Sequence, residues 1–264
     1  MTVDLDAYFE RIQWNGATSP TYQTLAALQH AHTGHIPFEN LDVLLGRKVR
    51  LDLEGVQAKL VHARRGGYCF EHATLFAAVL EQIGFQPIRH AGRVVLFDPL
   101  SQSPRTHMFL TVEIDDARYI VDPGFGPFGW RVPIRLDEGE REAATHWMSR
   151  DGGRWTLHVR RDGHAIPGWV TTLEQENLVD FEVANHFIAT HTASPFVNRI
   201  MLSVATPEGR VSIMNRDVTI LHRGESRSVV LANRSALRSL LAEYFGFDLP
   251  EVEHLKVPTL PEWD

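Results

Sequence analysis

Cysteine is almost absent from this chain, because Cys69 is the one thiol among 264 residues. No disulfide can form within the chain, and any thiol chemistry must take place at Cys69. A lone thiol is typical of a reducing compartment. The first residues also lack a basic region followed by an apolar one, which a secretory signal requires. The sequence therefore predicts a cytoplasmic protein.

Long apolar runs and an excess of positive charge are missing as well. No segment approaches the roughly 20 apolar residues that cross a bilayer. The net charge is −7 with the histidines neutral, whereas nucleic acid and anionic membranes are bound by basic surfaces. No glycine-rich dinucleotide or phosphate-binding loop motif occurs. The sequence therefore has no common nucleotide-binding loop, and neither nucleic acid nor a membrane is expected as a partner.

The predicted elements are helices first, then strands, then a mixed segment. Helical spacing of apolar residues predicts a helix that begins at Ser19-Pro20, one that Asp52 caps, and one over 70–83. A short helix is also predicted over 181–188, and a final helix after Asn233. Runs of β-branched and aromatic residues predict strands at 88–97, 107–114, 118–121, 155–159, 169–173, 200–205, 211–214, 218–221 and 228–231. This order disfavours a doubly wound parallel sheet, in which strands and helices alternate.

The most informative stretch surrounds the cysteine and reads Arg-Arg-Gly-Gly-Tyr-Cys-Phe-Glu-His over residues 64–72. Gly66 and Gly67 allow a tight turn and the close approach of a ligand to the backbone. Cys69 begins the predicted helix, and N–H groups at a helix N-terminus stabilise a thiolate and an oxyanion. The pattern indicates a nucleophilic thiol, although an ordinary glycine turn before a helix has the same composition.

A reactive cysteine needs a base, and His107 and Asp122 are candidates for a base and its orienting group. If the strands at 107–114 and 118–121 form a hairpin through Asp115-Asp116, His107 lies opposite residue 124. Asp122 is then its neighbour on the same face, roughly 7 Å away by backbone spacing. A register shift of one residue would separate them, so an ordinary strand-end histidine and a turn aspartate stay open.

Several motifs together resemble those of the arylamine N-acetyltransferase family. Residues 65–72 resemble its cysteine motif, Thr106-His107 matches its histidine strand, and residues 121–126 are similar to its aspartate motif. Residues 36–41 and 194–196 resemble two further family segments. Their order along the chain is that of the family. Two positions depart from it: Ala73 stands where the family usually has Asn, and Pro123 where it usually has an aliphatic residue.

The resemblance implies a two-step acyl transfer from acetyl-CoA to the nitrogen of arylamines, hydrazines or arylhydroxylamines. Cys69 would be the nucleophile, His107 the base and proton shuttle, and Asp122 the group that orients His107. By the same resemblance, Phe38, Phe125 and Phe196 would line the acceptor pocket, and Thr106 and Gly126 would lie near the cofactor. Arg65 and Glu39 are expected to form a structural ion pair.

The fold implied by the resemblance is α+β, with a Cys-His-Asp core like that of cysteine proteases. A helical bundle (1–86) would be followed by an antiparallel β-barrel-like domain (87–185) and an α/β lid (186–264). A monomer or a homodimer is expected. No metal is expected, since the spacings of His30, His32 and His35, and of His62 and His72, match no familiar zinc pattern.

Three other functions stay open at this stage. A macrolactam-forming amide synthase would use the same acyl-enzyme with a different acceptor. A Cys-His-Asp hydrolase would give the acyl group to water. A binding protein on a disabled scaffold would have an unreactive Cys69, and Ala73 and Pro123 are the features that favour it.

Overall fold

The first third of the chain is helical in the computed structural model, which describes residues 2–136, 139–140, 144–161 and 163–260. Side chains of Asp4, Thr21 and Asp52 cap three of the helices by accepting backbone N–H groups. The cap at Asp52 was predicted, whereas the start at Ser19-Pro20 was wrong, since Thr21 is the N-cap. The elements are α1 (Leu5–Arg11), α2 (Tyr22–His35), α3 (Leu41–Leu44), α4 (Leu53–Gln57), the π-helical η1 (Ala58–His62) and α5 (Cys69–Gln82).

Seven antiparallel strands form the middle of the molecule, in the order β4-β3-β2-β1-β7-β6-β5. The end strands β4 and β5 contact each other, so the sheet curls into a nearly closed barrel. Phe109, Leu157 and Trp169 are fully buried inside it. The strands are β1 (Ile88–Val94), β2 (Arg105–Ile114), β3 (Ala117–Val121), β4 (Ile134–Arg135), β5 (His146–Asp151), β6 (Arg154–Arg161) and β7 (His164–Thr171), with the 3-10 helix η2 (Gly126–Phe128) after β3.

The hairpin of β2 and β3 has the register that the sequence predicted. Ile114 pairs with Ala117, and Leu110 pairs with Val121. Asp115 and Asp116 both have positive φ, 48° and 61°, which is the backbone that a two-residue type I′ hairpin turn requires. Continued along the strands, this register places residue 107 opposite residue 124.

A second sheet and short helices make up the C-terminal part, with strand order β11-β10-β9-β8. Leu41 of α3 belongs to the apolar core beneath this sheet, so the helical part and the C-terminal part share one core. The elements are α6 (Leu178–Thr190), α7 (Pro195–Asn198), β8 (Met201–Thr206), β9 (Gly209–Met214), β10 (Asp217–His222), β11 (Glu225–Val230), α8 (Arg234–Leu240), the π-helical η3 (Leu241–Phe245) and the 3-10 helix η4 (Pro250–His254).

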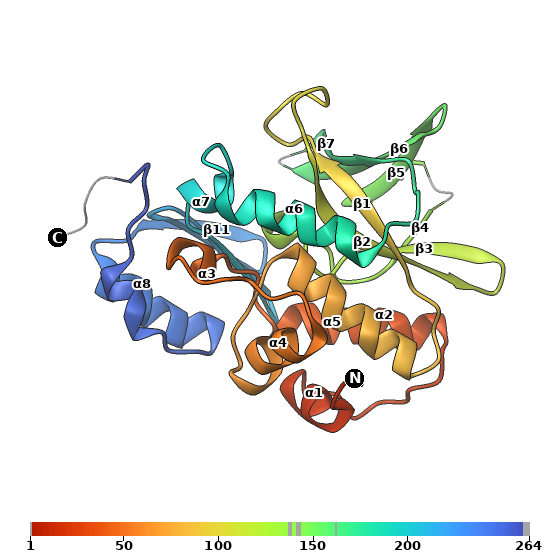
Figure 1. The fold of residues 1–264 in the computed structure, drawn as a ribbon, viewed down its shortest axis with the longest axis horizontal. Helices are drawn as coiled ribbons and strands as arrows, with labels where there is room; N and C mark the ends of the chain where they lie inside the picture. Colours follow the sequence, from red (N-terminus) through yellow and green to blue (C-terminus); the bar gives the residue numbers. More distant parts are fainter. Residues whose placement is uncertain (1, 137–138, 141–143, 162, 261–264) are drawn as a thin grey trace.

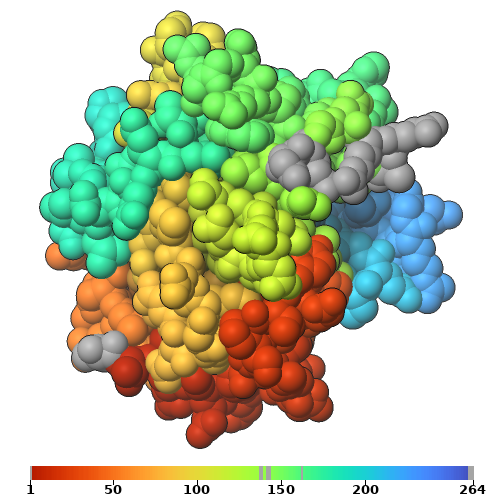
Figure 2. Space-filling view, turned by 90° about the vertical axis from the view of Figure 1, so that its right-hand side faces the viewer, coloured from red at the N-terminus to blue at the C-terminus, as the bar shows by residue number. Residues whose placement is uncertain are grey.

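The three parts lie side by side around the centre of the molecule (Figures 1 and 2). In Figure 1 the helices of the first third lie at the bottom, the barrel at the upper right, and α8 with the C-terminal sheet at the left. Helix α6 crosses the middle and contacts β2. The α+β architecture is thus the expected one. The division after residues 86 and 185 stays a prediction, and its second boundary falls inside α6.

Phe38, before α3, connects the helical part with the C-terminal sheet through backbone pairing. Phe38 donates its N–H to the Ser203 carbonyl (2.8 Å) and accepts the Ser203 N–H (2.9 Å). On the other side Phe38 bridges to Gly67, two residues before the cysteine. The C-terminal sheet is therefore paired, through one extended residue, with the turn that carries Cys69.

Candidate active site

Cys69 is the first residue of α5, as the sequence predicted. Tyr68 precedes the helix, and its backbone N–H donates to a Glu71 carboxylate oxygen at 3.0 Å, which fixes the first turn. The thiol is 3% exposed, and its Sγ lies 3.7 Å from the Thr106 carbonyl oxygen. The positive end of the helix dipole thus falls on a nearly buried sulfur, next to the backbone N–H groups of the first turn of α5.

Glycines before and opposite the cysteine allow the backbone segments to approach closely. A Cβ atom at Gly66 would lie 2.1 Å from the Pro37 carbonyl oxygen. A Cβ at Gly124 would lie 2.6 Å from the Cys69 Cα. Real Cβ atoms do not come so near, so each position requires glycine. The segment after β3 is therefore packed directly against the start of α5.

His107 and Asp122 meet on the inner face of the hairpin, as predicted. His107 Nε2 lies 2.6 Å from Asp122 Oδ2, and both residues are buried. Asp122 Oδ2 also accepts Trp169 Nε1–H at 3.2 Å, and its Oδ1 accepts the Gly124 N–H at 3.2 Å. Three donors thus hold the carboxylate in one orientation, and the imidazole has only Nδ1 left to face Cys69.

The pKa of His107 follows from these neighbours. Burial on its own would lower the pKa, but the negative charge of Asp122 and the hydrogen bonds to Asp122 and Cys69 outweigh burial and raise it to about 10. The imidazole therefore carries a proton at neutral pH. A protonated ring beside a sulfur is the electrostatic arrangement of an ion-pair nucleophile.

An apolar cavity of about 420 Å³ opens over Cys69 and His107. Phe38, Phe125 and Phe196, the three predicted acceptor-pocket residues, all line it. A volume of this size accommodates a small organic molecule, and aromatic walls suit an aromatic one. The arrangement therefore combines a buried thiol with an aryl-sized space.

The two residues predicted to lie near the cofactor are separated in the structure. Thr106 lines the cavity above Cys69. Gly126 lines a different and much smaller hollow of about 30 Å³, which Asp122 and Phe38 also line. Its φ is +59°, and a Cβ there would lie 3.1 Å from the Phe38 ring. Gly126 thus shapes the wall behind Phe38.

Sequence reasoning missed three aromatic residues of the cavity, Phe97, which follows β1, together with Phe128 and Phe187. Phe187 lies in α6, inside the helix predicted over 181–188, but nothing in its local pattern distinguishes the cavity from the core. Phe128 follows Phe125 by three residues in η2, and that spacing was the available signal. Phe128 and Phe187 both reach the cavity through long-range packing.

The departures from the family pattern are compatible with this geometry. Ala73 of α5 is fully buried in the hydrophobic core. Its methyl group contributes packing and makes no hydrogen bond. Pro123 has no N–H to offer, yet Asp122 Oδ1 receives the next N–H along the chain, that of Gly124. Proline therefore leaves the orientation of Asp122 intact.

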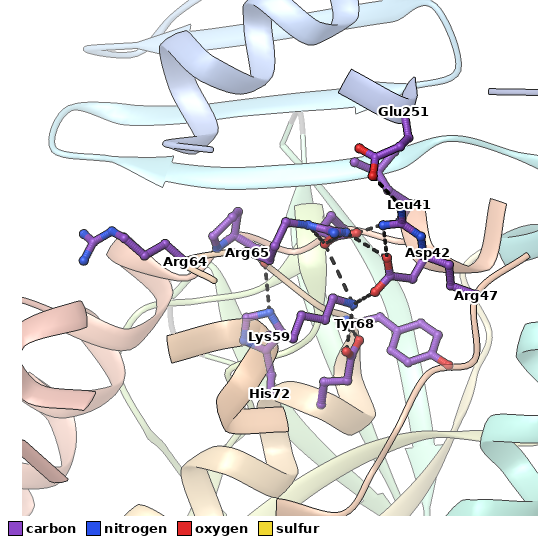
Figure 3. A network of polar contacts seen from close by, with 12 residues as sticks. Leu41, Asp42, Arg47, Lys59, Arg64, Arg65, Tyr68, His72 and Glu251 are labelled. Atoms are coloured by element: carbon purple, nitrogen blue, oxygen red, sulfur yellow. Dashed lines mark hydrogen bonds and ion pairs between the residues drawn. The ribbon is translucent and has the colours of Figure 1, made fainter. Parts of the chain in front are cut away.

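A network of buried charges lies behind the cysteine turn (Figure 3). Arg65 binds Glu39 at 2.6 Å and Asp42 at 3.2 Å, which confirms the predicted ion pair. Lys59 Nζ lies 2.8 Å from Asp42 Oδ2 and 2.8 Å from Glu71 Oε1. Three carboxyl groups thus share two close cations. Burial raises the pKa of Glu71 to about 7, and the charge of Lys59 offsets this only in part.

The same network extends to the C-terminal part of the chain. Arg47 lies 3.6 Å from Asp42 and 2.7 Å from Glu251 of η4. The Arg65 guanidinium also lies over the Phe247 ring, 5.2 Å from its centroid. The base of the site is therefore held by residues from both ends of the chain.

Among the described residues, no three His, Cys, Asp or Glu side chains are grouped so as to hold a metal ion. Within the same part of the chain, every helix is too short or too polar to cross a bilayer.

Comparison with known proteins gives one consistent result. A family model described as N-acetyltransferase matches residues 21–254. The arylamine N-acetyltransferase of Mycolicibacterium smegmatis is 36% identical over 260 residues, which cover 96% of this chain and 94% of that protein. A Salmonella typhimurium relative, named arylamine N-acetyltransferase / N-hydroxyarylamine O-acetyltransferase, is 35% identical over 259 residues, with coverage of 96% and 92%.

Solved structures agree with the sequence relatives. The structure of Mycobacterium marinum arylamine N-acetyltransferase in complex with CoA matches with a TM-score of 0.89 at 34% identity, over 94% of each chain. The Mycobacterium tuberculosis arylamine N-acetyltransferase matches with a TM-score of 0.89 at 35% identity, again over 94% of each chain. Identity at this level over nearly the whole length leaves one assignment: the chain belongs to the arylamine N-acetyltransferase family.

Proposed function

We propose that this protein transfers the acetyl group of acetyl-CoA to the nitrogen of arylamines, hydrazines or arylhydroxylamines through an acetyl-Cys69 intermediate. The observation that carries the proposal is the contact of His107 with Asp122 at 2.6 Å beside a buried thiol at a helix N-terminus. Relatives named for this activity, one solved with CoA, support the same donor and acceptor class.

In the first half-reaction the Cys69 thiolate attacks the thioester carbonyl of acetyl-CoA. The negative charge that develops on the carbonyl oxygen is stabilised by backbone N–H groups at the start of α5. The carbon–sulfur bond to CoA then breaks, and the departing sulfur takes the proton of the His107 imidazolium. The products are free CoA thiol, an acetyl-cysteine and a neutral His107.

In the second half-reaction the neutral His107 acts as the base. The amine nitrogen attacks the acetyl carbonyl, and His107 accepts the proton that the nitrogen loses. Cys69 leaves as a thiolate beside the imidazolium that has just formed. The starting charges are restored, and no proton has to enter from solvent. Arylamines suit this scheme because they are neutral, and so nucleophilic, at pH 7.

The acceptor would lie among Phe38, Phe125 and Phe196, and Thr106 would lie beside the thioester. Gly126 would affect the acceptor only indirectly, through its contact with the Phe38 ring. The aromatic cavity also keeps water from the acyl-enzyme, so that transfer is faster than hydrolysis. Phe196→Ala should change the preference among aryl acceptors. An unchanged preference would contradict the assignment of this pocket.

Release of CoA thiol from acetyl-CoA tests the function directly. It should be measured with and without an aminobenzoate or a hydrazine, for the wild type and for Cys69→Ala. Amine-dependent release that the variant loses is the expected result. Release that depends on Cys69 but not on amine would assign a hydrolase. No release under any condition would point to another acyl donor, such as the carrier-bound polyketide of an amide synthase, or to a disabled site.

A further inference from the structure

Four buried groups form a continuous chain of hydrogen bonds beneath Cys69 that the proposed mechanism does not use. Tyr8 Oη lies 2.9 Å from His32 Nδ1, and His32 Nε2 lies 2.9 Å from His72 Nδ1. His72 Nε2 lies 3.2 Å from the Pro37 carbonyl oxygen. The three side chains are almost completely buried. The chain runs from α1 through α2 and α5 to the segment before α3.

The last acceptor determines the direction of every bond in this chain. A carbonyl oxygen can only accept, so His72 Nε2 carries the hydrogen. His72 Nδ1 is then bare and accepts from His32 Nε2–H. His32 Nδ1 is bare in turn and accepts the Tyr8 hydroxyl proton. Each imidazole is therefore the neutral Nε2–H tautomer, and its ring orientation follows from its two partners.

The surroundings of the two imidazoles agree with that assignment. Burial lowers the pKa of His72 to about 4, although the Pro37 and Gly67 carbonyls favour the charged form. Burial, with the charges of His72 and Arg11, also holds the pKa of His32 well below its usual value. Both rings thus stay neutral at physiological pH, so the direction of the hydrogen bonds is constant.

The Pro37 carbonyl at the end of the chain belongs to the peptide that places Phe38. This oxygen also accepts the Gly67 N–H at 3.2 Å, and the N–H of the same peptide donates to Ser203 at 2.8 Å. Phe38 lines the cavity above Cys69. His72 thus adds a side-chain donor to a peptide that two backbone hydrogen bonds also hold, and it lies one helical turn after Cys69 beside the charged network (Figure 3).

We propose that His72, oriented by His32 and Tyr8, is a positioning residue for the aryl pocket: its Nε2–H fixes the Pro37–Phe38 peptide and so sets the place of the Phe38 ring. The thiol itself is held separately, by α5 and by Gly124. Loss of the His72 hydrogen bond should therefore weaken recognition of an aromatic group and leave the reactivity of Cys69 unchanged. This inference rests on the proposed function only in taking Phe38 as part of the acceptor pocket.

Alkylation of the single thiol tests the proposal without any acetyl transfer. Two reagents are compared, iodoacetamide and an N-aryl iodoacetamide whose ring needs the Phe38 pocket. His72→Leu should lower the ratio of the aryl rate to the iodoacetamide rate by about fivefold, the effect of one lost hydrogen bond. The iodoacetamide rate should stay near the wild-type value. Because no acetyl group moves, the result holds even in a protein without transferase activity.

Two further variants separate positioning from simple destabilisation. His72→Gln keeps an amide N–H that can donate to the Pro37 carbonyl and an amide oxygen that can accept from His32 Nε2–H, so it should retain the wild-type ratio. His90→Leu removes another buried histidine with two hydrogen bonds, away from the residues that line the cavity, and it should lower the unfolding temperature without changing the ratio. The proposal would be overturned if the rate ratio fell equally in His72→Leu and His72→Gln, or if both reagents reacted equally more slowly with His72→Leu.

Imidazole ¹⁵N spectra give an independent check on the direction of the chain. His32 and His72 should each show a protonated Nε2 and a bare Nδ1 at neutral pH. A protonated Nδ1 on His72 would overturn the proposal, because the ring could then not donate to Pro37.

Discussion

Gly124 lies against Cys69 so closely that a single added carbon would stand 2.6 Å from the Cys69 Cα. The contact joins the loop after Asp122 to the first residue of α5, so the base and the nucleophile are held by backbone as well as by side chains. The orientation of the site thus depends on the absence of a side chain at this position.

Gly124→Ala should therefore separate the thiol from His107. We expect kcat/KM to fall by about 100-fold, the loss that a misplacement of about 1 Å produces. Gly153→Ala is the matched control, since nothing lies within 4 Å of a Cβ there. Steady-state kinetics of both variants, with circular dichroism to verify folding, gives the answer. Equal kcat/KM values for the two variants would contradict this prediction, because the loop after Asp122 would then be able to move away from Cys69.

Asp122→Asn should remove the charge that keeps His107 protonated. The pKa of His107 would fall from about 10, because burial would no longer be opposed by a carboxylate. We expect kcat to fall by at least about 100-fold, by comparison with other orienting aspartates. An NMR titration of the His107 imidazole measures the fall in its pKa. Asp116→Asn, in the turn of the same hairpin, should leave both kcat and the pKa of His107 unchanged.

Arg210 of β9 should matter for the shape of the acceptor pocket. Its guanidinium donates to the Gly126 carbonyl at 3.0 Å and to the Gly129 carbonyl at 2.7 Å. Burial and the nearby charges of Arg131 and Arg161 lower the pKa of Arg210 to about 10, but it stays charged at pH 7.

Arg210→Met would leave both of those carbonyls without this donor. We expect a loss of about 2 kcal/mol in the free energy of unfolding and a higher KM for the aryl acceptor. Arg227→Met, on the exposed strand β11, is the control. Urea unfolding and acceptor kinetics measure the two effects. A variant as stable as the wild type, with the same KM, would contradict the role of this arginine.

Glu71 should make the stability of the protein depend on pH. Its pKa rises on folding from 4.5 to about 7, so between these values the folded protein holds a proton that the unfolded chain has released. The free energy of unfolding therefore falls as pH rises through this window. Glu71→Gln does not titrate, and its unfolding temperature relative to the wild type should rise by several degrees from pH 5 to pH 8. Parallel curves for the two proteins would refute this, and Glu113→Gln serves as the exposed control.

Local features of the site could be predicted from the sequence because short-range geometry determines them. The turn at Asp115-Asp116 fixes the register of its hairpin, and that register brings His107 to Asp122. The glycine turn before Cys69, the cap at Asp52 and the helix after Asn233 likewise depend on only a few neighbouring residues.

Features that depend on distant contacts could not be predicted in this way. The pairing of β1 with β7 joins residues more than seventy positions apart, and no local pattern encodes it. Strand β5 was missed because His146–Asp151 alternates poorly between apolar and polar residues. Phe187 and the contacts of the charge network with Glu251 and Phe247 become recognisable only once α6 and the C-terminal part are packed against the first helices.

Pairing of Phe38 with Ser203 makes the C-terminal sheet one wall of the cavity, to which Met201 and Met214 contribute side chains. Cys69, His107 and Asp122 all come from the other two parts of the chain. Separate stretches of sequence thus encode the groups proposed for the chemistry and part of the surface that selects among acceptors. Substitutions or grafts within β8 and β9 can accordingly diversify acceptor choice over evolution, or in a designed library, while the reacting groups keep their places.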